Sequence, residues 1–189
     1  MPKTIAFVCA KGGTGKTTLA VMFAMTLRLA DRKVSIDDRD PQQNATLGAR
    51  INDLPIGPHA EDCVIIDTSP HIELPGTLAA IREADLVVLV LRPELYDLVN
   101  AKATYKVIQQ IRPPEAKTVM VFNQVRQDTI VSKDIMAAKN EIPLPCLKST
   151  IRFSARYSRA NRFGWRVLTK AEKEEALTFF IELANFSNS

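Results

Sequence analysis

CAKGGTGKTT, residues 9–18, is the most informative stretch of this sequence for the fold. Three of the chain's seven glycines, Gly12, Gly13 and Gly15, stand within four positions of this stretch. A short apolar run precedes them and a mostly apolar stretch follows. This order predicts a buried strand, a tight glycine-rich turn and a helix, a combination in which backbone N–H groups and the helix N-terminus converge on an anion.

The same stretch predicts that the anion is a nucleoside triphosphate. In a loop of the form G-x-x-x-x-G-K-[ST], the lysine reaches the β- and γ-phosphates and the hydroxyl residue binds Mg²⁺. Lys16 and Thr17 stand at these two positions, whereas Ala10 replaces the first glycine and an additional lysine, Lys11, follows it. The loop residues expected to bind the nucleotide are Gly12, Gly13, Thr14, Gly15, Lys16, Thr17 and Thr18.

Apolar runs alternate with helical patterns along the rest of the chain. The expected strands are 4–9, 33–37, 63–67, 86–91 and 118–123, with a short edge strand at 143–147. The expected helices are 17–30, 76–84, 95–111 and 132–140, and 41–62 is the least structured region. Continuous apolar strands separated by helices predict an α/β fold with a doubly wound, mostly parallel sheet and helices on both faces. We expect residues 1–189 to form a single domain.

Composition excludes several other classes of protein. No segment approaches the roughly 20 apolar residues that span a bilayer, and the N-terminus lacks the apolar region of a signal peptide. Cys9, Cys63 and Cys146 lie far apart without a C-x-x-C motif, which argues against a zinc site or a disulfide framework. These features favour a cytoplasmic protein with reduced thiols.

Two further residues are expected at the ends of strands. CVIID, residues 63–67, is an apolar strand that ends in an aspartate, the Walker B pattern, in which Asp67 holds Mg²⁺ through water. Asn123 is the last residue of the strand expected at 118–123, at the sheet edge where ligands bind. Its amide can pair with the donor and acceptor edge of adenine.

The motif K-G-G-x-G-K-[ST], residues 11–17, resembles the deviant Walker A loop of the ParA/MinD ATPases. IDDRDPQQNAT, residues 36–46, is similar to the D-x-D-P-Q-x-N-x-T segment of the same family. The resemblance implies a P-loop NTPase fold in which Lys11 reaches across a nucleotide-sandwich homodimer to the phosphates of the partner. It also implies that Asp40 positions or activates the attacking water and that Asp38 supports the Mg²⁺ and its water shell.

Two residues in this segment depart from the family pattern. Asp37 and Arg39 stand where the family usually has apolar residues, which makes the register of Asp38 and Asp40 a question for the structure. The family also uses an asparagine at the place that matches Asn123 to contact adenine.

A basic segment lies at residues 148–173, with eight basic residues and one acid, Glu172. Arg152, Arg156, Arg159 and Arg162 are spaced by four, three and three residues, which places them along one stripe of a helix ending at Gly164. Such a stripe predicts nonspecific, salt-dependent contact with nucleic-acid phosphates.

The last helix is expected to begin with a capping box at Thr169 and Glu172. Its apolar face is expected to pack on the core through Leu177, Phe180, Ile181 and Ala184. Because this helix has few basic residues, it does not match the basic amphipathic membrane helix of MinD-type relatives.

The resemblance is to the small partition ATPases. It implies ATP/ADP and Mg²⁺ as cofactors, an ATP-dependent homodimer, nonspecific binding of nucleoid DNA, and stimulation by a ParB-like centromere-binding or cargo-adaptor protein. The implied role is segregation of plasmid or chromosome DNA, with a nucleoid-associated location and no membrane partner. Four alternatives remain open: positioning of a protein cargo on the nucleoid, membrane cycling of the MinD kind, a metal-cluster or reductase ATPase, and a small-molecule kinase or ligase.

Overall fold

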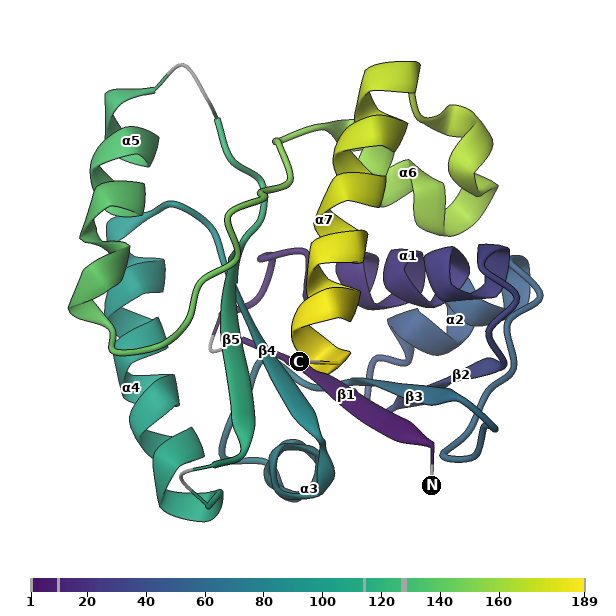
Figure 1. Cartoon of the computed structure of the whole chain (residues 1–189), viewed down its shortest axis with the longest axis horizontal. Coiled ribbons are helices and arrows are strands. Elements are labelled where there is room, and N and C mark those ends of the chain that lie inside the picture. The colour runs from purple at the N-terminus through teal and green to yellow at the C-terminus, as the bar shows by residue number, and fades with distance from the viewer. Residues whose placement is uncertain (1, 10, 114, 127–128, 189) are drawn as a thin grey trace.

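A computed structural model describes residues 2–9, 11–113, 115–126 and 129–188, without the side chains of residues 131, 136, 138 and 139. The strands that it contains are β1 (Lys3–Val8), β2 (Val34–Asp38), β3 (Cys63–Asp67), β4 (Leu86–Leu91) and β5 (Lys117–Phe122). They form a five-stranded sheet in the order β2-β3-β1-β4-β5, and every neighbouring pair is parallel (Figure 1). The predicted α/β class with a parallel sheet is therefore confirmed.

Helices cover both faces of this sheet. They are α1 (Lys16–Leu29), α2 (Asn44–Ile51), α3 (Pro75–Glu83), α4 (Leu95–Ile111), α5 (Ile130–Ala137), α6 (Ala155–Phe163) and α7 (Lys170–Asn188), with the short 3₁₀ segments η1 (Ala138–Glu141) and η2 (Trp165–Val167). Helices α1, α2, α6 and α7 lie on one face, and α3, α4 and α5 lie on the other (Figure 1). Among the described residues, no helix combines the length and the apolar character that crossing a bilayer requires.

The alternation of side chains along β1 builds two cores at once. Ile5 and Phe7 point into the core under α1 and α7, whereas Ala6 and Val8 point into the core under α3. Successive residues of a strand face opposite sides of the sheet, so a strand covered on both faces must be apolar throughout. This requirement explains why the central strands appear in the sequence as unbroken apolar runs.

Helix α1 is the most deeply buried helix of the first face. Its Phe23 lies 6.1 Å from Phe7 of β1 and 5.5 Å from Phe180 of α7, measured between ring centroids. Offset and tilted aromatic pairs at these distances add to the stabilisation that burial provides. These contacts fix α1, and with it the glycine-rich loop at its N-terminus, against the middle of the sheet.

Helix α7 packs on the core as predicted, but through a different set of side chains. The capping box is confirmed, because Thr169 Oγ1 accepts a hydrogen bond from Glu172 N at 3.2 Å and the Glu172 carboxylate accepts one from Thr169 N at 2.8 Å. Leu177 and Ile181 are 39% and 56% exposed, so the expected apolar face was partly wrong. The buried positions are Ala176, Phe179, Phe180 and Leu183, spaced by three, one and three residues.

Two other expectations from the sequence were wrong. Residues 143–147 do not form a strand: they run beside β5 with a single bridge, in which Met120 N donates to Pro145 O at 2.8 Å. The prolines in this segment remove the donors that a regular ladder needs. Region 41–62 contains helix α2, which the abundance of proline and glycine there concealed. Gly48 lets α2 approach α1, since a Cβ at this position would lie 3.1 Å from Val21.

Candidate functional site

Every strand of the sheet delivers a candidate functional residue at its carboxyl end. The glycine-rich loop follows β1, Asp38 ends β2, Asp67 ends β3, Asp97 lies in the helix after β4, and Asn123 follows β5. The chain passes from β3 across β1 to β4, so the order of strands reverses at β1. Ligands of open α/β sheets bind in the crevice outside such a switch point.

The loop after β1 has the backbone of a phosphate-binding turn. Gly13 and Gly15 have φ angles of 82° and 81°, in the left-handed region that favours glycine. A Cβ at Gly15 would lie 2.3 Å from Asn123 Nδ2, whereas a Cβ at Gly12 or Gly13 would meet nothing within 4 Å. Gly12 and Gly13 therefore leave the loop backbone open to an approaching ligand. Ala10, at the place of the missing first glycine, lies outside the described residues.

The centre of the site joins the buried Lys16 and Asp67 with the partly buried Thr17. Lys16 Nζ lies 2.6 Å from Asp67 Oδ1, and Thr17 Oγ1 donates to Asp67 Oδ2 at 2.7 Å. Burial raises the pKa of Asp67, and the Lys16 ammonium opposes that rise. Lys16 and Asp67 are almost fully buried, at 4% and 0% exposure. The structure thus brings together the lysine, the hydroxyl and the carboxylate that the sequence assigns to phosphate and metal.

The donor set fits a nucleotide with a divalent cation. Thr17 and Asp67 offer hydroxyl and carboxylate oxygens, which are the ligands that Mg²⁺ prefers. The hydroxyl of Thr14 is buried in the same loop, and among the described residues it interacts with the Cys9 thiol. A thiol is a weak hydrogen-bond partner, so this hydroxyl remains able to donate to an oxygen of a bound phosphate.

Asp38 and Asp40 occupy a turn next to this centre. Asp38 pairs in register with Asp67 across β2 and β3. Its carboxylate accepts hydrogen bonds from Asp40 N at 3.1 Å and from Thr46 N at 2.7 Å, which ties the turn to the first residues of α2. Asp40 is half-buried, and its carboxylate accepts from Gln42 N at 3.1 Å. Asp38 therefore sets the shape of the segment that carries Asp40.

The two departures from the family pattern are bonded to each other. Arg39 Nε lies 2.8 Å from Asp37 Oδ2, and Arg39 Nη2 lies 2.8 Å from Glu83 Oε2 in the last turn of α3. This pairing holds Asp37 to the side, away from Asp38, whose place opposite Asp67 is fixed by the strand register. The additional charges therefore connect the end of β2 with α3, and the roles of Asp38 and Asp40 stay predictions.

Asn123 and its neighbour Gln124 hold the loop from the β5 side. Asn123 Nδ2 donates to Thr14 O at 2.7 Å, and Gln124 Nε2 donates to Gly13 O at 2.8 Å. Asn123 is 4% exposed, so its amide nitrogen is committed to the loop here, and contact with adenine stays a prediction. Sequence reasoning missed Gln124, whose place beside Asn123 at a strand end was the available signal.

Lys11 does not extend freely into solvent. Its Nζ lies 3.1 Å from Asp97 Oδ1 and 3.7 Å from Glu94 Oε2, at the start of α4. Burial alone would raise the pKa of Asp97, but hydrogen bonds from Arg92 and Lys11 outweigh burial and hold that pKa below its ordinary value. Sequence reasoning missed Asp97 because nothing local connects it with the loop after β1.

The basic segment differs from the continuous stripe that its spacing predicted. Helix α6 begins only after Ser154, whose hydroxyl accepts from Arg156 N at 3.2 Å, and it ends at Gly164 as expected. Arg152 therefore precedes the helix, contrary to the prediction. Its Nε lies 2.6 Å from Glu175 Oε2 of α7.

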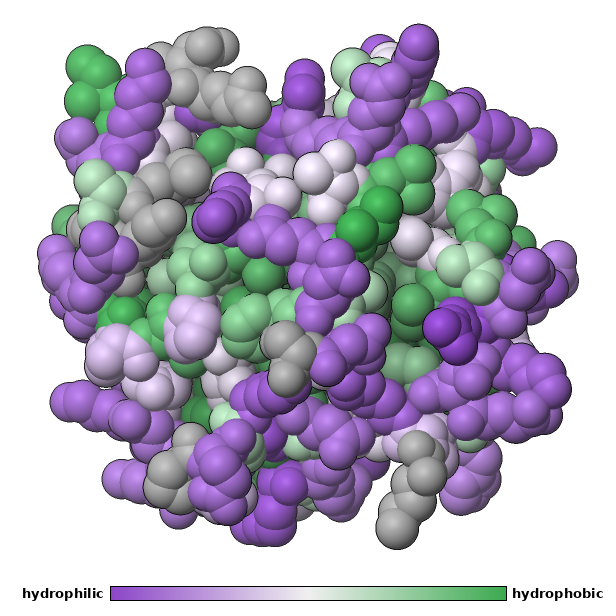
Figure 2. All heavy atoms as spheres, in the orientation of Figure 1, coloured by the Kyte–Doolittle hydropathy of each residue, from purple (hydrophilic) through white to green (hydrophobic). Residues whose placement is uncertain are grey.

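Acidic residues of α7 neutralise part of this surface. Besides the pair of Arg152 with Glu175, Arg156 Nη1 lies 3.6 Å from Glu172 Oε1. Arg159 and Arg162 instead flank the ring of Phe163, with Cζ at 5.6 Å and 5.4 Å from its centroid. Within the described part of the chain, these two arginines have no ion pair. Hydrophilic side chains lie along the rim at the upper right of Figure 2, with hydrophobic ones between them.

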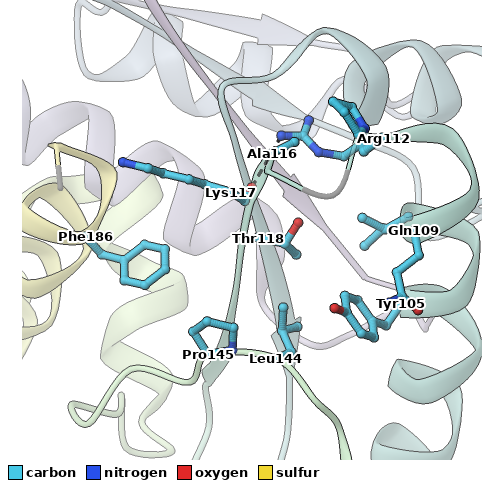
Figure 3. Close-up of a pocket in the computed structure, with 11 residues that line it drawn as sticks. Tyr105, Gln109, Arg112, Ala116, Lys117, Thr118, Leu144, Pro145 and Phe186 are labelled. Carbon is cyan, nitrogen blue, oxygen red and sulfur yellow. Dashed lines mark hydrogen bonds between the residues drawn. The ribbon is translucent and has the colours of Figure 1, made fainter.

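A separate cavity lies near the other end of β5. Its volume is about 380 Å³, and side chains of α4, β5, α7 and the segment before Cys146 line it (Figure 3). Arg112 contributes a buried guanidinium there, but Nη1 donates to Ala84 O at 2.6 Å and to Ile81 O. These carbonyls end α3, so the arginine caps that helix. The cavity is distant from the loop and shares none of its residues.

Comparisons with known proteins agree with this geometry. The model of the CobQ/CobB/MinD/ParA nucleotide binding domain matches residues 5–167. The chain is 24% identical over 179 residues to maintenance of carboxysome distribution protein A of Halothiobacillus neapolitanus, with 83% of this chain and 82% of that protein covered. It is 34% identical over 166 residues to the chromosome-partitioning ATPase Soj of Treponema pallidum, covering 77% of this chain and 58% of Soj.

Solved structures show the same fold. A putative plasmid partition protein from Borrelia burgdorferi bound to AMPPNP superposes with a TM-score of 0.77, at 14% identity and with 98% of each chain covered. The match to a family model over most of the chain, together with the loop, the Lys16–Asp67 pair and the parallel sheet, leaves no other assignment of the fold. The chain is a ParA-like member of the CobQ/CobB/MinD/ParA nucleotide-binding-domain family.

Proposed function

We propose that this protein is a Mg²⁺-dependent ATPase of the partition type, which hydrolyses ATP to ADP and phosphate. The observation that carries this proposal is the group of Lys16, Thr17 and Asp67 beneath a glycine-rich loop that carries a second lysine, Lys11. The Lys16 ammonium has three N–H donors and uses one of them on Asp67, so the others are available to phosphate oxygens.

Each residue of the site has a role in this proposal. The backbone of the loop from Gly12 to Thr18 binds the phosphates, and Thr17 and Asp67 hold the metal with support from Asp38. When bound, Mg²⁺ neutralises phosphate charge. Asp40 orients the attacking water, an effect of position more than of covalent chemistry. Asn123 contacts adenine as it holds the loop.

The second lysine distinguishes this proposal from that of a simple nucleotide-binding protein. We propose that Lys11 contacts the phosphates bound by the other protomer of an ATP-dependent homodimer. Two triphosphates that face each other repel, and one ammonium group from each side offsets this repulsion. Self-association then depends on which nucleotide is bound.

DNA is the proposed ligand of the dimer, and Arg159 and Arg162 of α6 are the proposed principal contacts. Both guanidinium groups lack an ion pair among the described residues, whereas Arg152 and Arg156 are paired with acids of α7. Two copies of this surface in a dimer double the number of phosphate contacts, which links DNA affinity to the nucleotide state. The proposed regulator is a ParB-like or cargo-adaptor protein, and the proposed location is the nucleoid in the cytoplasm.

A second candidate function keeps the same cycle and changes the cargo. The match to maintenance of carboxysome distribution protein A covers 83% of this chain. We therefore propose a protein assembly as the alternative cargo to a plasmid or chromosome. Isolation of the stimulating partner separates the two. A centromere-binding protein supports partition, and a shell or receptor adaptor supports positioning of a protein cargo.

DNA retardation with ATP, with ADP and without nucleotide tests the proposed function. We expect a strong shift with ATP alone, on DNA of any sequence, that weakens steeply as salt rises. Equal retardation under all three conditions would show that DNA binding does not depend on the bound nucleotide, which contradicts the proposed link between the two. Release of a phosphorylated metabolite in place of free phosphate would identify a small-molecule kinase instead.

A further inference from the structure

Four charged side chains meet where the loop after β1 approaches the start of α4. Lys11 Nζ lies 3.1 Å from Asp97 Oδ1 and 3.7 Å from Glu94 Oε2. Arg92 contacts the same two carboxylates, with Nε 2.9 Å from Asp97 Oδ2 and Nη2 3.0 Å from Glu94 Oε2. Two cations and two anions leave the cluster without net charge.

Asp97 is the fixed member of this cluster. Its side chain is 1% exposed, and its carboxylate accepts hydrogen bonds from three donors of Arg92: the backbone N, Nε and Nη2. A buried carboxylate that loses every donor is costly, but Asp97 keeps these three when Lys11 departs. Lys11 can therefore leave without stranding a buried charge.

Lys11 is a solvent-accessible member of the cluster. Its side chain is 39% exposed and lies on a loop, whereas its partner is anchored in the first turn of a helix. Leu95 and Tyr96, which are 60% and 73% exposed, lie between Glu94 and Asp97 in the sequence and face away from the core. The cluster thus stands at the surface of the protomer, next to the phosphate-binding loop.

From this arrangement we infer that Asp97 is a positioning residue for Lys11, which it holds within its own protomer until a second protomer offers phosphates. This inference rests on the proposed ATP-dependent homodimer. Because Lys11 must move away from the start of α4 to reach phosphates bound by another protomer, every dimer contact made by Lys11 is made in competition with Asp97 and Glu94. Asp97 therefore raises the protein concentration at which ATP causes dimers to form.

The competition predicts the direction of a substitution. Asp97→Asn preserves the shape of the side chain and removes the charge that holds Lys11. We expect the dissociation constant of the dimer formed with a nonhydrolysable ATP analogue to fall by about 1.4- to fivefold for each of the two ion pairs removed, the range that corresponds to one partly exposed ion pair. If Asp97 instead presented Lys11 to the partner, the same substitution would weaken the dimer.

A matched control separates this effect from a general loss of charge. Glu141 pairs with Lys102 of α4, at a site that does not include the loop. Glu141→Gln removes the same charge and should leave the dissociation constant unchanged. Lys11→Ala combined with Asp97→Asn should dimerise no better than Lys11→Ala alone, because the substitution acts through Lys11.

Chemical labelling tests the contact without reference to the dimer. In the monomeric protein without nucleotide, the acylation rate of Lys11 by an N-hydroxysuccinimide ester, followed by mass spectrometry, should rise severalfold in Asp97→Asn. The rate at Lys170, whose side chain is 92% exposed, supplies the internal reference. Should Asp97→Asn fail to fold, the exposed Glu94→Gln should give a smaller rise of the same sign. An unchanged labelling rate overturns the inference.

The two experiments separate failure of this inference from failure of the proposed function. A wild-type protein that never dimerises with the ATP analogue contradicts the proposed function, whatever the labelling shows. A wild-type protein that dimerises, together with an Asp97→Asn variant that dimerises equally or less well, leaves the function standing and overturns the assigned role of Asp97.

Discussion

Lys16 Nζ and Asp67 Oδ1 lie 2.6 Å apart in the buried centre of the site. The pair joins the N-terminus of α1 to the end of β3. It connects stability with function, because the groups proposed to bind phosphate and metal also neutralise each other inside the protein. Replacing one of them should therefore affect both properties.

Lys16→Ala should abolish ATP binding and lower the free energy of unfolding by about 3 kcal/mol, because Asp67 is left as a buried charge without its partner. Titration with a fluorescent ATP analogue measures the first effect and urea unfolding measures the second. The double variant Lys16→Ala/Asp67→Asn should regain most of the stability and none of the binding. A double variant no more stable than Lys16→Ala would show that the two charges are not coupled.

Gly15→Ala should destabilise the protein by about 2 kcal/mol, since alanine at a φ of 81° is strained and its Cβ would lie 2.3 Å from Asn123 Nδ2. Gly12→Ala is the matched control, because its Cβ would meet nothing within 4 Å. Thermal unfolding of the two variants checks this difference. Equal losses would mean that the close packing of Asn123 against the loop does not contribute.

Asp40→Ala should retain ATP binding and lose turnover, so that dimers accumulate with ATP. Asp38→Ala, by contrast, should lower the free energy of unfolding by about 1 kcal/mol, because Thr46 N loses the carboxylate that accepts its hydrogen bond at 2.7 Å. Phosphate release and urea unfolding, measured on both variants, distinguish them. Normal phosphate release by Asp40→Ala would contradict the role proposed for that carboxylate.

Replacement of Arg159 and Arg162 together by alanine should weaken DNA binding and lower the salt slope by about 2, or about 1 for each arginine that no longer neutralises a phosphate. Arg152→Ala should have a smaller effect, since Glu175 already neutralises that guanidinium. ATP binding serves as the control and should not change. Retention of the full salt slope in the double variant would reject α6 as the DNA-binding surface.

Glu182 fixes α7 to the segment that follows residue 147, because its carboxylate accepts from Lys148 N and Ser149 N, each at 2.8 Å. Burial alone would raise its pKa, but these hydrogen bonds together outweigh burial and hold the pKa below the ordinary value. A lowered pKa stabilises the fold above the unfolded value of about 4.3, and this stabilisation is lost as pH falls through the folded pKa.

Glu182→Gln should accordingly cost about 1 kcal/mol at pH 7, and the difference from wild type should shrink as pH falls below about 4. Urea unfolding of both proteins at several pH values measures this convergence. A constant difference across that range would mean that the ionised carboxylate is not the stabilising form.

Sequence predicted those elements of the fold whose apolar pattern is visible in the residues of the element itself. The strands at 63–67 and 86–91 and the helix at 95–111 have the predicted bounds, because their apolar content shows along the chain itself. The strand expected at 143–147 was wrong because prolines remove ladder donors, and α2 was missed among residues that usually indicate loops.

The site shows the same division. Lys16, Thr17 and Asp67 come together as predicted, since motifs at the ends of parallel strands converge on one edge of a sheet. The contact of Lys11 with Asp97 and the pairing of Arg152 with Glu175 join elements that are distant in sequence. No local pattern reports such contacts, so the count of charges in 148–173 overstated the basic surface.

Sedimentation velocity of the wild-type protein and of Lys11→Ala, each with ADP and with a nonhydrolysable ATP analogue, asks whether Lys11 couples the bound nucleotide to self-association. We predict dimers only for the wild-type protein with the ATP analogue, and monomers in the other three samples. Dimers of Lys11→Ala with the analogue, at the same concentration as wild type, would contradict this coupling.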